Sequence, residues 1–144
     1  DPKEGIRKAQ KLLITWLTEE ARVYPVIKAH IQPSDFIEPL YCKVAELLYE
    51  QLEAGALNPA KIISCFTNEE EQREVAALFN TKLEEIESKA EQEKALRDII
   101  VKVKQNSLLH EGEEELPEDM DALKKMISDK KALEALTQLH ISLD

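Results

Sequence analysis

The sequence predicts an all-α protein, a compact multi-helix bundle followed by a C-terminal helical hairpin. Of the 144 residues, 33% are charged and 5% aromatic, and glycine occurs only three times. This composition is typical of helical proteins rather than of β-sandwiches or barrels. Apolar residues recur three and four positions apart in segments separated by proline, asparagine and glycine. We therefore expect a bundle over residues 1–109, ending in a long connecting helix, and a hairpin over residues 110–144.

The first two expected helices precede residue 31. Residues 6–17 have the apolar spacing of a helix with one buried face. Residues 1–5 are expected to be a linker, because a chain that begins with Asp rather than Met looks like a piece of a longer polypeptide. Thr18 is placed to cap a second helix, which would run to about His30. Since proline disrupts a helix interior, Pro25 either lies in the first turn or bends this helix.

A compact corner ends that helix and begins the next one. Pro33 disfavours helical geometry at the residue before it, and Ser34 or Asp35 can cap exposed backbone amides. Phe36 supplies a large apolar anchor. Pro39 suits the first turn of the following helix, where its missing N–H is no loss. We expect this corner to fix how two helices pack.

Three further helices follow, each with its own start signal. The first covers residues 39–54, and Gly55 then supplies the left-handed residue that commonly closes a helix. Asn58 is expected to cap the second, with a proline at its first position. Thr67 or Asn68 caps the third, which carries three glutamates near the positive end of its dipole. The apolar residues expected to face the core are Leu40, Val44, Leu47, Leu48, Ile62, Ile63, Phe66, Val75, Leu78 and Phe79.

A longer helix is predicted from Lys82 to about Leu109, because apolar residues recur at helical spacing through it. It should begin packed on the bundle and project from it further along. Residues 111–121, which follow, carry seven acids and no base. This stretch is either a solvated loop or an electrostatic contact for a basic partner, and Pro117 can open the final helical region.

The terminal stretch, residues 122–144, contains two apolar groups on either side of residues 128–131. It forms either one helix or a tight pair. Because a hairpin this small buries little apolar area by itself, its leucines need a second surface, either the bundle or another protein. The first group is Leu123, Met126 and Ile127, and the second is Leu133, Leu136, Leu139, His140, Ile141 and Leu143.

Charge and motif patterns argue against several functions. The net charge is −10, with 8 basic and 9 acidic side chains in residues 1–66 and 11 and 20 in residues 67–144. An acidic surface repels phosphate, so direct nucleic-acid binding is not expected. No apolar run approaches the ~20 residues that span a bilayer, and no signal peptide is visible.

We expect no catalytic group, metal site or cofactor in this chain. Its three histidines, at positions 30, 110 and 140, are far apart. Cys42 and Cys65 are widely spaced, which suggests ordinary reduced thiols in a cytoplasmic protein rather than zinc ligands. A phosphate-binding glycine loop and a Gly-x-Ser-x-Gly motif are both missing.

The stretch from Ile31 to Gly55 also carries a family resemblance. With Pro33, the Asp35-Phe36 pair, a proline at the next helix start and a helix ending in Leu-Glu-Ala-Gly, it resembles a bundle shared by two bacterial replication modules. One is the C-terminal helicase-binding domain of bacterial DNA primase, and the other is the N-terminal domain of the replicative hexameric helicase. The whole chain is more similar to the primase module of a Bacillus-type bacterium, from the Leu-Leu-Ile-Thr-Trp-Leu helix at residues 12–17 to the terminal residues 139–144.

The resemblance implies a non-catalytic, cytoplasmic interaction domain that is monomeric when isolated. It would dock on the N-terminal domains of the hexameric helicase, recruit primase to the replication fork and stimulate the helicase. The polymerising chemistry and the zinc-binding region would lie elsewhere in the longer protein. Two alternatives stay open: the helicase's own N-terminal oligomerisation domain, or an unrelated acidic helical adaptor.

Most of the grip on the partner is expected from the terminal hairpin, as a helix laid into a groove between partner helices. Leu133 and Leu136 are equally well explained by closing the hairpin internally. Ile141 and Leu143 are harder to bury internally because they lie near a chain end. The expected partner-binding residues are the apolar anchors Leu133, Leu136, Leu139, Ile141 and Leu143 and the rim residues Lys130, Lys131, Gln138 and His140.

Overall fold

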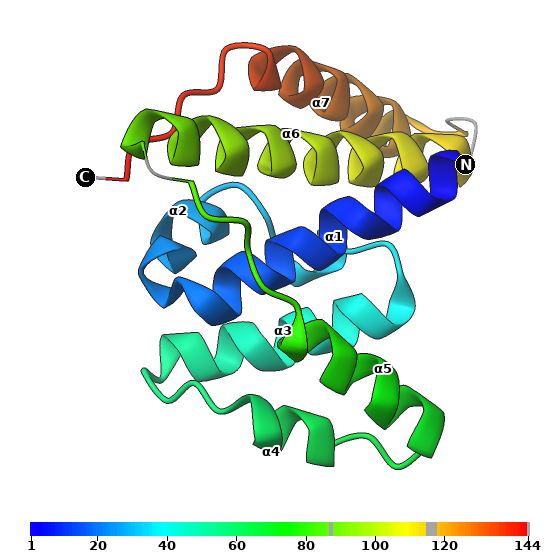
Figure 1. Ribbon diagram of the computed structural model, residues 1–144. Helices are drawn as coiled ribbons and strands as arrows, with labels where there is room; N and C mark the ends of the chain where they lie inside the picture. The colour runs from blue at the N-terminus through cyan, green and yellow to red at the C-terminus, as the bar shows by residue number, and fades with distance from the viewer. Residues whose placement is uncertain (87, 115–117, 144) are drawn as a thin grey trace.

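The computed structural model describes residues 1–86, 88–114 and 118–143, with the backbone alone for residues 111–114. The described residues form helices joined by short connections and contain no β-strand, which confirms the predicted all-α class (Figure 1). None of these helices is both long enough and apolar enough to cross a membrane. In chain order the elements are α1 (Pro2–Glu19), the 3₁₀ turn η1 (Ala21–Val23), α2 (Tyr24–Lys28), the 3₁₀ turn η2 (Pro33–Asp35), α3 (Pro39–Glu53), α4 (Pro59–Ser64), α5 (Glu69–Asn80), α6 (Lys89–Glu114) and α7 (Met120–Leu136).

Helix α1 lies between α6 on one side and α3 and α5 on the other, and it contacts all three (Figure 1). Its buried face includes Leu13 and Leu17, both fully enclosed, and Trp16, which is 6% exposed. The side chain of Asp1 caps the helix by accepting a hydrogen bond from the backbone N–H of Lys3 at 3.0 Å. The prediction of a linker over residues 1–5 is therefore wrong, because helix α1 starts at Pro2.

The break between α1 and α2 lies later than expected. Thr18 belongs to α1 and its hydroxyl donates to the carbonyl of Thr15 at 3.1 Å, so the predicted cap at Thr18 is wrong. The single helix predicted up to His30 is instead the turn η1 and the short helix α2. Pro25 lies in the first turn of α2, which confirms one of its two expected positions.

The remaining helix boundaries in the bundle follow the local signals. Gly55 has a φ of 66° directly after α3, as predicted for a helix-closing glycine. Asn58 caps α4 by accepting from the N–H of Lys61 at 3.2 Å. Asn68, rather than Thr67, caps α5 through two backbone amides.

The corner between α2 and α3 is anchored from three sides. Phe36 is 1% exposed, as expected of an apolar anchor. The hydroxyl of Tyr49 on α3 donates to the carbonyl of Ile31 at 2.7 Å. Gln10 on α1, itself 1% exposed, accepts from the backbone N–H of Glu38 at 3.2 Å. These bonds hold the start of α3 against both α1 and the chain before the corner.

Helix α6 differs from the prediction at both ends. It begins at Lys89 rather than Lys82, and residues 82–86 form a non-helical strap. The backbone N–H of Leu83 in this strap donates to the carboxylate of Glu19 at 2.9 Å. The helix then continues to Glu114, so the expected loop is helical over its first four residues.

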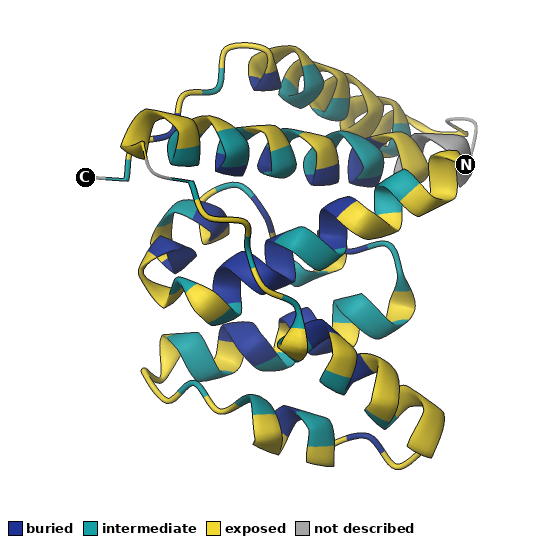
Figure 2. Ribbon diagram, in the orientation of Figure 1, coloured by how far each residue is buried: buried dark blue, intermediate teal, exposed yellow. Residues whose placement is uncertain are grey.

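The far half of α6 is packed rather than projecting as expected. Val103, Ser107 and Leu108 are all buried, and α7 covers α6 on the side away from α1 (Figures 1 and 2). The expected boundary between residues 109 and 110 falls inside this helix. The division of the chain into two units stays a prediction.

The terminal region contains one helix, not two, within its described residues. Helix α7 runs without interruption through residues 128–131 and ends at Leu136, after which residues 137–143 are not helical. The predicted hairpin over residues 110–144 is therefore not confirmed; among the described residues, α7 lies antiparallel beside α6 (Figure 1). Asp119 caps α7 by accepting from the N–H of Ala122 at 2.7 Å. The predicted helix start at Pro117 lies outside the described residues.

Candidate interaction surface

The second apolar group of the terminal region turns inward. Leu136 is 7% exposed and Ile141 only 3%. Leu139 and Leu143 are half-buried and pack against the core. Arg97 on α6 donates a 3.0 Å hydrogen bond to the carbonyl of Leu139, which holds the tail in place. The expectation that Ile141 is hard to bury internally is therefore wrong, while the role of these residues in partner binding stays a prediction.

The predicted rim residues lie on the surface. Lys130 and Lys131 are exposed on α7, and Gln138 and His140 are exposed in the tail. Leu133, one helical turn before the end of α7, is half-buried. The predicted rim residues are thus exposed, whereas Leu136 and Ile141 of the predicted apolar anchors are buried.

The large apolar side chains that remain exposed belong mainly to the first apolar group. Among the described residues, four of them lie on α7 and one, Leu109, on α6. The α7 side chains share one face by their spacing, and Figure 2 shows the outer side of α7 as exposed. We call these four residues the α7 strip: Met120, Leu123, Met126 and Ile127, with exposed fractions of 63%, 36%, 48% and 48%.

The α7 strip is flanked by charged side chains of both signs. Lys125 pairs with Asp129 at 3.1 Å along the helix, and Lys124 is exposed beside them. An apolar surface with a polar rim is the usual form of a protein interaction site. Sequence reasoning identified this apolar group but assigned the grip to the second one. No signal in the sequence marked this difference, because the second group folds back after Leu136 through contacts with α6.

A second cluster centres on Asp35, the only charged side chain that is buried in the part of the chain described. Its carboxylate accepts from the N–H of Gln32 at 2.8 Å and from the hydroxyl of Ser107 at 2.7 Å. The ammonium of Lys104 donates to both carboxylate oxygens at 3.1 Å. Because fixed donors of the chain occupy both oxygens, this cluster is suited to joining the corner to α6 rather than to catalysis.

Sequence reasoning assigned Asp35 a capping role and missed its partners on α6. Its bond to Gln32 agrees with that role. Lys104 and Ser107 are three positions apart and therefore share a helix face. These two polar residues share a face with the apolar Ile100 and Val103, and this pattern could have indicated a buried polar contact.

The cysteine and tyrosine side chains whose pKa values are shifted are not activated as nucleophiles or bases. Burial raises the pKa of the Cys42 thiol, and the neighbouring Glu46 raises it further, so the reactive thiolate is disfavoured. Burial and the nearby Glu53 raise the pKa of Tyr24 to about 12. Burial also raises the pKa of Tyr49, whose ring meets that of Tyr24 edge-on at 5.1 Å. Within the described ranges, no group of three or more His, Cys, Asp or Glu side chains is close enough to hold a metal ion.

Comparison with known proteins found no family model, no curated protein sequence and no solved structure that matches this chain. The resemblance to the primase module therefore stays an expectation drawn from the residues of the chain itself. The exposed α7 strip is the structural feature that bears most directly on function.

Proposed function

We propose that this chain is the helicase-binding domain of a bacterial DNA primase and docks on the N-terminal domains of the replicative hexameric helicase. In the cytoplasm it would recruit primase to the replication fork and stimulate the helicase. The resemblance of Ile31–Gly55 and the order of the other segments support this proposal. The observation that carries it is the exposed α7 strip, because clustered apolar side chains on a surface mark sites of protein interaction.

The α7 strip is available to a partner because other apolar residues of the terminal region cover the core and the strip does not. Leu136 and Ile141 are buried, whereas Met126 and Ile127 are about half exposed. From Met120 to Ile127 the strip extends roughly 10 Å along the helix. That length suits an amphipathic helix laid into a groove of another helical protein.

The predicted rim residues fit the same mode of binding. Lys130 and Lys131 continue along α7 from the strip and are exposed. Charged residues at the rim of an interface affect orientation and association rate more than affinity. The binding affinity would therefore come mainly from the apolar side chains of the α7 strip, together with the half-buried Leu133.

Docking through this surface would act by tethering. Holding the polymerising part of primase beside the helicase raises its local concentration at the emerging single strand without any new catalytic contact. The chain itself, with a net charge of −10, would not bind that strand directly because its acidic surface repels phosphate.

Titration against a purified replicative helicase of a Bacillus-type bacterium tests the proposal. Complex size by light scattering and the helicase ATPase rate are followed together. Met126→Asp and Ile127→Asp should each weaken binding about tenfold or more, since charge would enter an apolar contact, while circular dichroism stays unchanged. Glu134→Ala, an exposed polar position on the same helix, is the matched control and should bind normally.

Each result has a definite meaning. No complex with the unmodified chain refutes the helicase as partner, and full binding by both aspartate variants refutes the strip as its contact. A truncation after Gln138 is a weaker test, because it removes Ile141 from the core and would confuse unfolding with lost contact.

The α7 strip is also compatible with the alternative of a helicase N-terminal oligomerisation domain. In that case the isolated chain should form dimers or trimers through the strip. If the chain is the primase domain, the isolated chain should be a monomer. Light scattering over a range of concentrations separates the two, and Met126→Asp should restore the monomer if the strip joins copies.

A further inference from the structure

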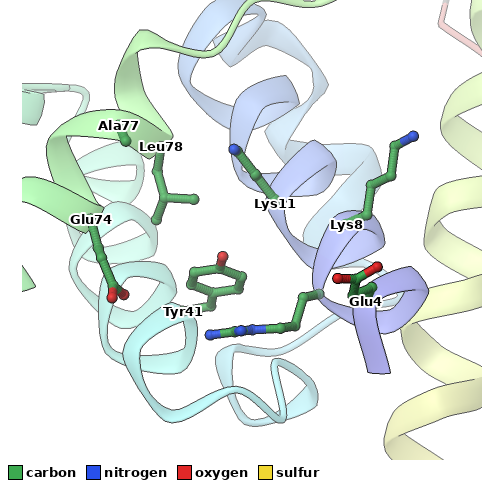
Figure 3. Close-up of a pocket in the computed structure, with 8 residues that line it drawn as sticks. Glu4, Lys8, Lys11, Tyr41, Glu74, Ala77 and Leu78 are labelled. Atoms are coloured by element: carbon green, nitrogen blue, oxygen red, sulfur yellow. The ribbon is translucent and has the colours of Figure 1, made fainter. Parts of the chain in front are cut away.

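A hollow with a basic rim lies on the surface between α1, α3 and α5. Its volume is about 360 Å³. Tyr41 of α3 and Leu78 of α5 face α1 across it, and Lys8 and Lys11 extend from α1 at its edge (Figure 3). In Figure 1, α6 separates this part of the molecule from α7, so the hollow is distinct from the α7 strip.

The cations of this basic hollow are only partly neutralised within the chain. Arg7 pairs with Glu38 at 3.3 Å. Lys8 and Lys11 have no hydrogen-bonding or ion-pairing partner for their side chains among the described residues. Residues 3–11 carry four bases and one acid in a protein whose net charge is −10. Three bases and two acids line the hollow, and Glu38 pairs with Arg7, so Lys8 and Lys11 are the cations there that can attract an anion.

The inner wall of the hollow is apolar, with one unused polar group. The ring of Tyr41 is half-buried beside Ala77 and Leu78. The hydroxyl of Tyr41 has no hydrogen-bond partner in the described part of the chain. Burial raises the pKa of Tyr41, so this hydroxyl stays protonated and remains a hydrogen-bond donor at neutral pH.

Two carboxylates restrict the class of anion that fits. Glu4 and Glu74 line the same hollow as the lysines. They would repel the closely spaced phosphates of a nucleic acid. A peptide in which single carboxylates alternate with apolar side chains avoids this repulsion and also covers the apolar wall.

We propose that the basic hollow binds an acidic, partly apolar peptide segment of a partner protein. Carboxylates of the peptide pair with Lys8 and with Lys11, whose ammonium groups extend in different directions (Figure 3), and an apolar side chain packs on Tyr41 and Leu78. This site goes beyond the proposed docking of α7 and does not depend on it, because the two surfaces share no residue.

The test is a titration of the isotope-labelled full chain, followed by the NMR shifts of its backbone amides. The probes are a short peptide of alternating leucine and glutamate and its glutamine counterpart. The glutamate peptide should shift the amides around Lys8, Lys11, Tyr41 and Leu78. The glutamine peptide should bind at least about fivefold more weakly, because it cannot form the ion pairs.

Charge-reversed variants locate the contact. Combining Lys8→Glu with Lys11→Glu should weaken binding of the glutamate peptide about tenfold or more. Lys61→Glu on α4 makes one such charge reversal at an exposed site away from the hollow and should bind normally. If the double reversal disturbs folding, the milder pair Lys8→Ala and Lys11→Ala is used and should still weaken binding.

Three outcomes overturn the proposal. The first is the absence of localised shifts, and the second is equal binding of the two peptides. The third is a stronger response of the same amides to a single-stranded oligonucleotide or to inorganic phosphate, which would assign the hollow to phosphate. None of these outcomes affects helicase binding through α7, so each proposal can fail alone.

Discussion

The hydroxyl of Ser107 donates a 2.7 Å hydrogen bond to the carboxylate of Asp35, a residue 72 positions earlier in the chain. Lys104, one helical turn before Ser107, donates to the same carboxylate. This cluster joins the corner before α3 to the middle of α6. Since buried carboxylates require compensation by hydrogen bonds and opposite charge, the packing of α6 on the bundle depends on Asp35.

Replacing Asp35 should therefore destabilise the whole fold. Asp35→Ala leaves Lys104, Ser107 and the N–H of Gln32 without their shared acceptor. We expect the free energy of unfolding to fall by about 2–4 kcal/mol, measured by urea denaturation. The control is Asp98→Ala, because Asp98 pairs with Arg97 at the surface with its side chain 51% exposed. Its cost should stay below about 1 kcal/mol, and equal costs for both variants would contradict the buried role of Asp35.

Truncating two isoleucines of the terminal region should have effects of very different size on stability. Ile141 is 3% exposed in the tail, whereas Ile127 is 48% exposed in the α7 strip. Ile141→Ala should lower the free energy of unfolding by about 2–4 kcal/mol, because it leaves a cavity in the core. Ile127→Ala should change it by no more than about 0.5 kcal/mol. A small effect at Ile141 in thermal or urea unfolding would show that the tail does not complete the core.

Two glycines provide a matched pair with opposite expected signs. Gly55 has a φ of 66°, a conformation that strains other residues, so Gly55→Ala should lower stability by about 1 kcal/mol. Gly5 lies within α1, where an added Cβ would meet only the ammonium of Lys102 at 3.6 Å. Gly5→Ala should raise stability by about 0.5–1 kcal/mol. Chemical denaturation of both variants measures the difference, and a loss at Gly5 would show that the first turn of α1 is not helical.

Stability should decline in alkali because of the tyrosines. Burial raises the pKa of Tyr24 from 10.0 to about 12, and it also raises the pKa values of Tyr41 and Tyr49. A raised pKa means that the folded chain holds the phenol proton more tightly than the unfolded chain. The resulting stabilisation is complete below pH 10.0, the ordinary value, and is lost as pH rises through the folded values.

Urea midpoints recorded with increasing pH test this expectation, together with the phenolate absorbance. The midpoints should stay level up to about pH 10 and fall above it. Tyr24→Phe should make the fall shallower, because one raised pKa is removed. If all three tyrosines ionise at their ordinary pKa while the helix content stays intact, the expected loss of stability in alkali is wrong.

Local signals in the sequence predicted the bounds of α3 and the starts of α4 and α5, because the groups involved lie within a few residues of one another. Gly55, Asn58 and Asn68 satisfy or close the adjacent helix end, and each could be recognised without knowing the rest of the fold. Thr18 shows where such signals are ambiguous. Its hydroxyl can cap a following helix or bond back to the preceding turn, and the structure has the second arrangement.

The candidate surface was harder to predict, because exposure of the terminal apolar residues depends on distant contacts. Ile141 is buried only because the chain reverses after Leu136 and returns to α6. The hydrogen bond from Arg97 to the carbonyl of Leu139 spans 42 residues. Helical spacing in the last residues carries no information about that reversal, so it could not show which apolar group stays outside.

The strap of residues 82–86 connects two parts of the chain that bury each other's apolar faces. Leu13 and Leu17 of α1 precede the strap, whereas Leu96 and Ile100 of α6 follow it, and α1 packs along α6. A proteolytic cut in the strap would thus leave two complementing fragments that remain associated. Each fragment alone would lack its opposite half of the hydrophobic interior and would unfold, so the two would regain structure only when mixed.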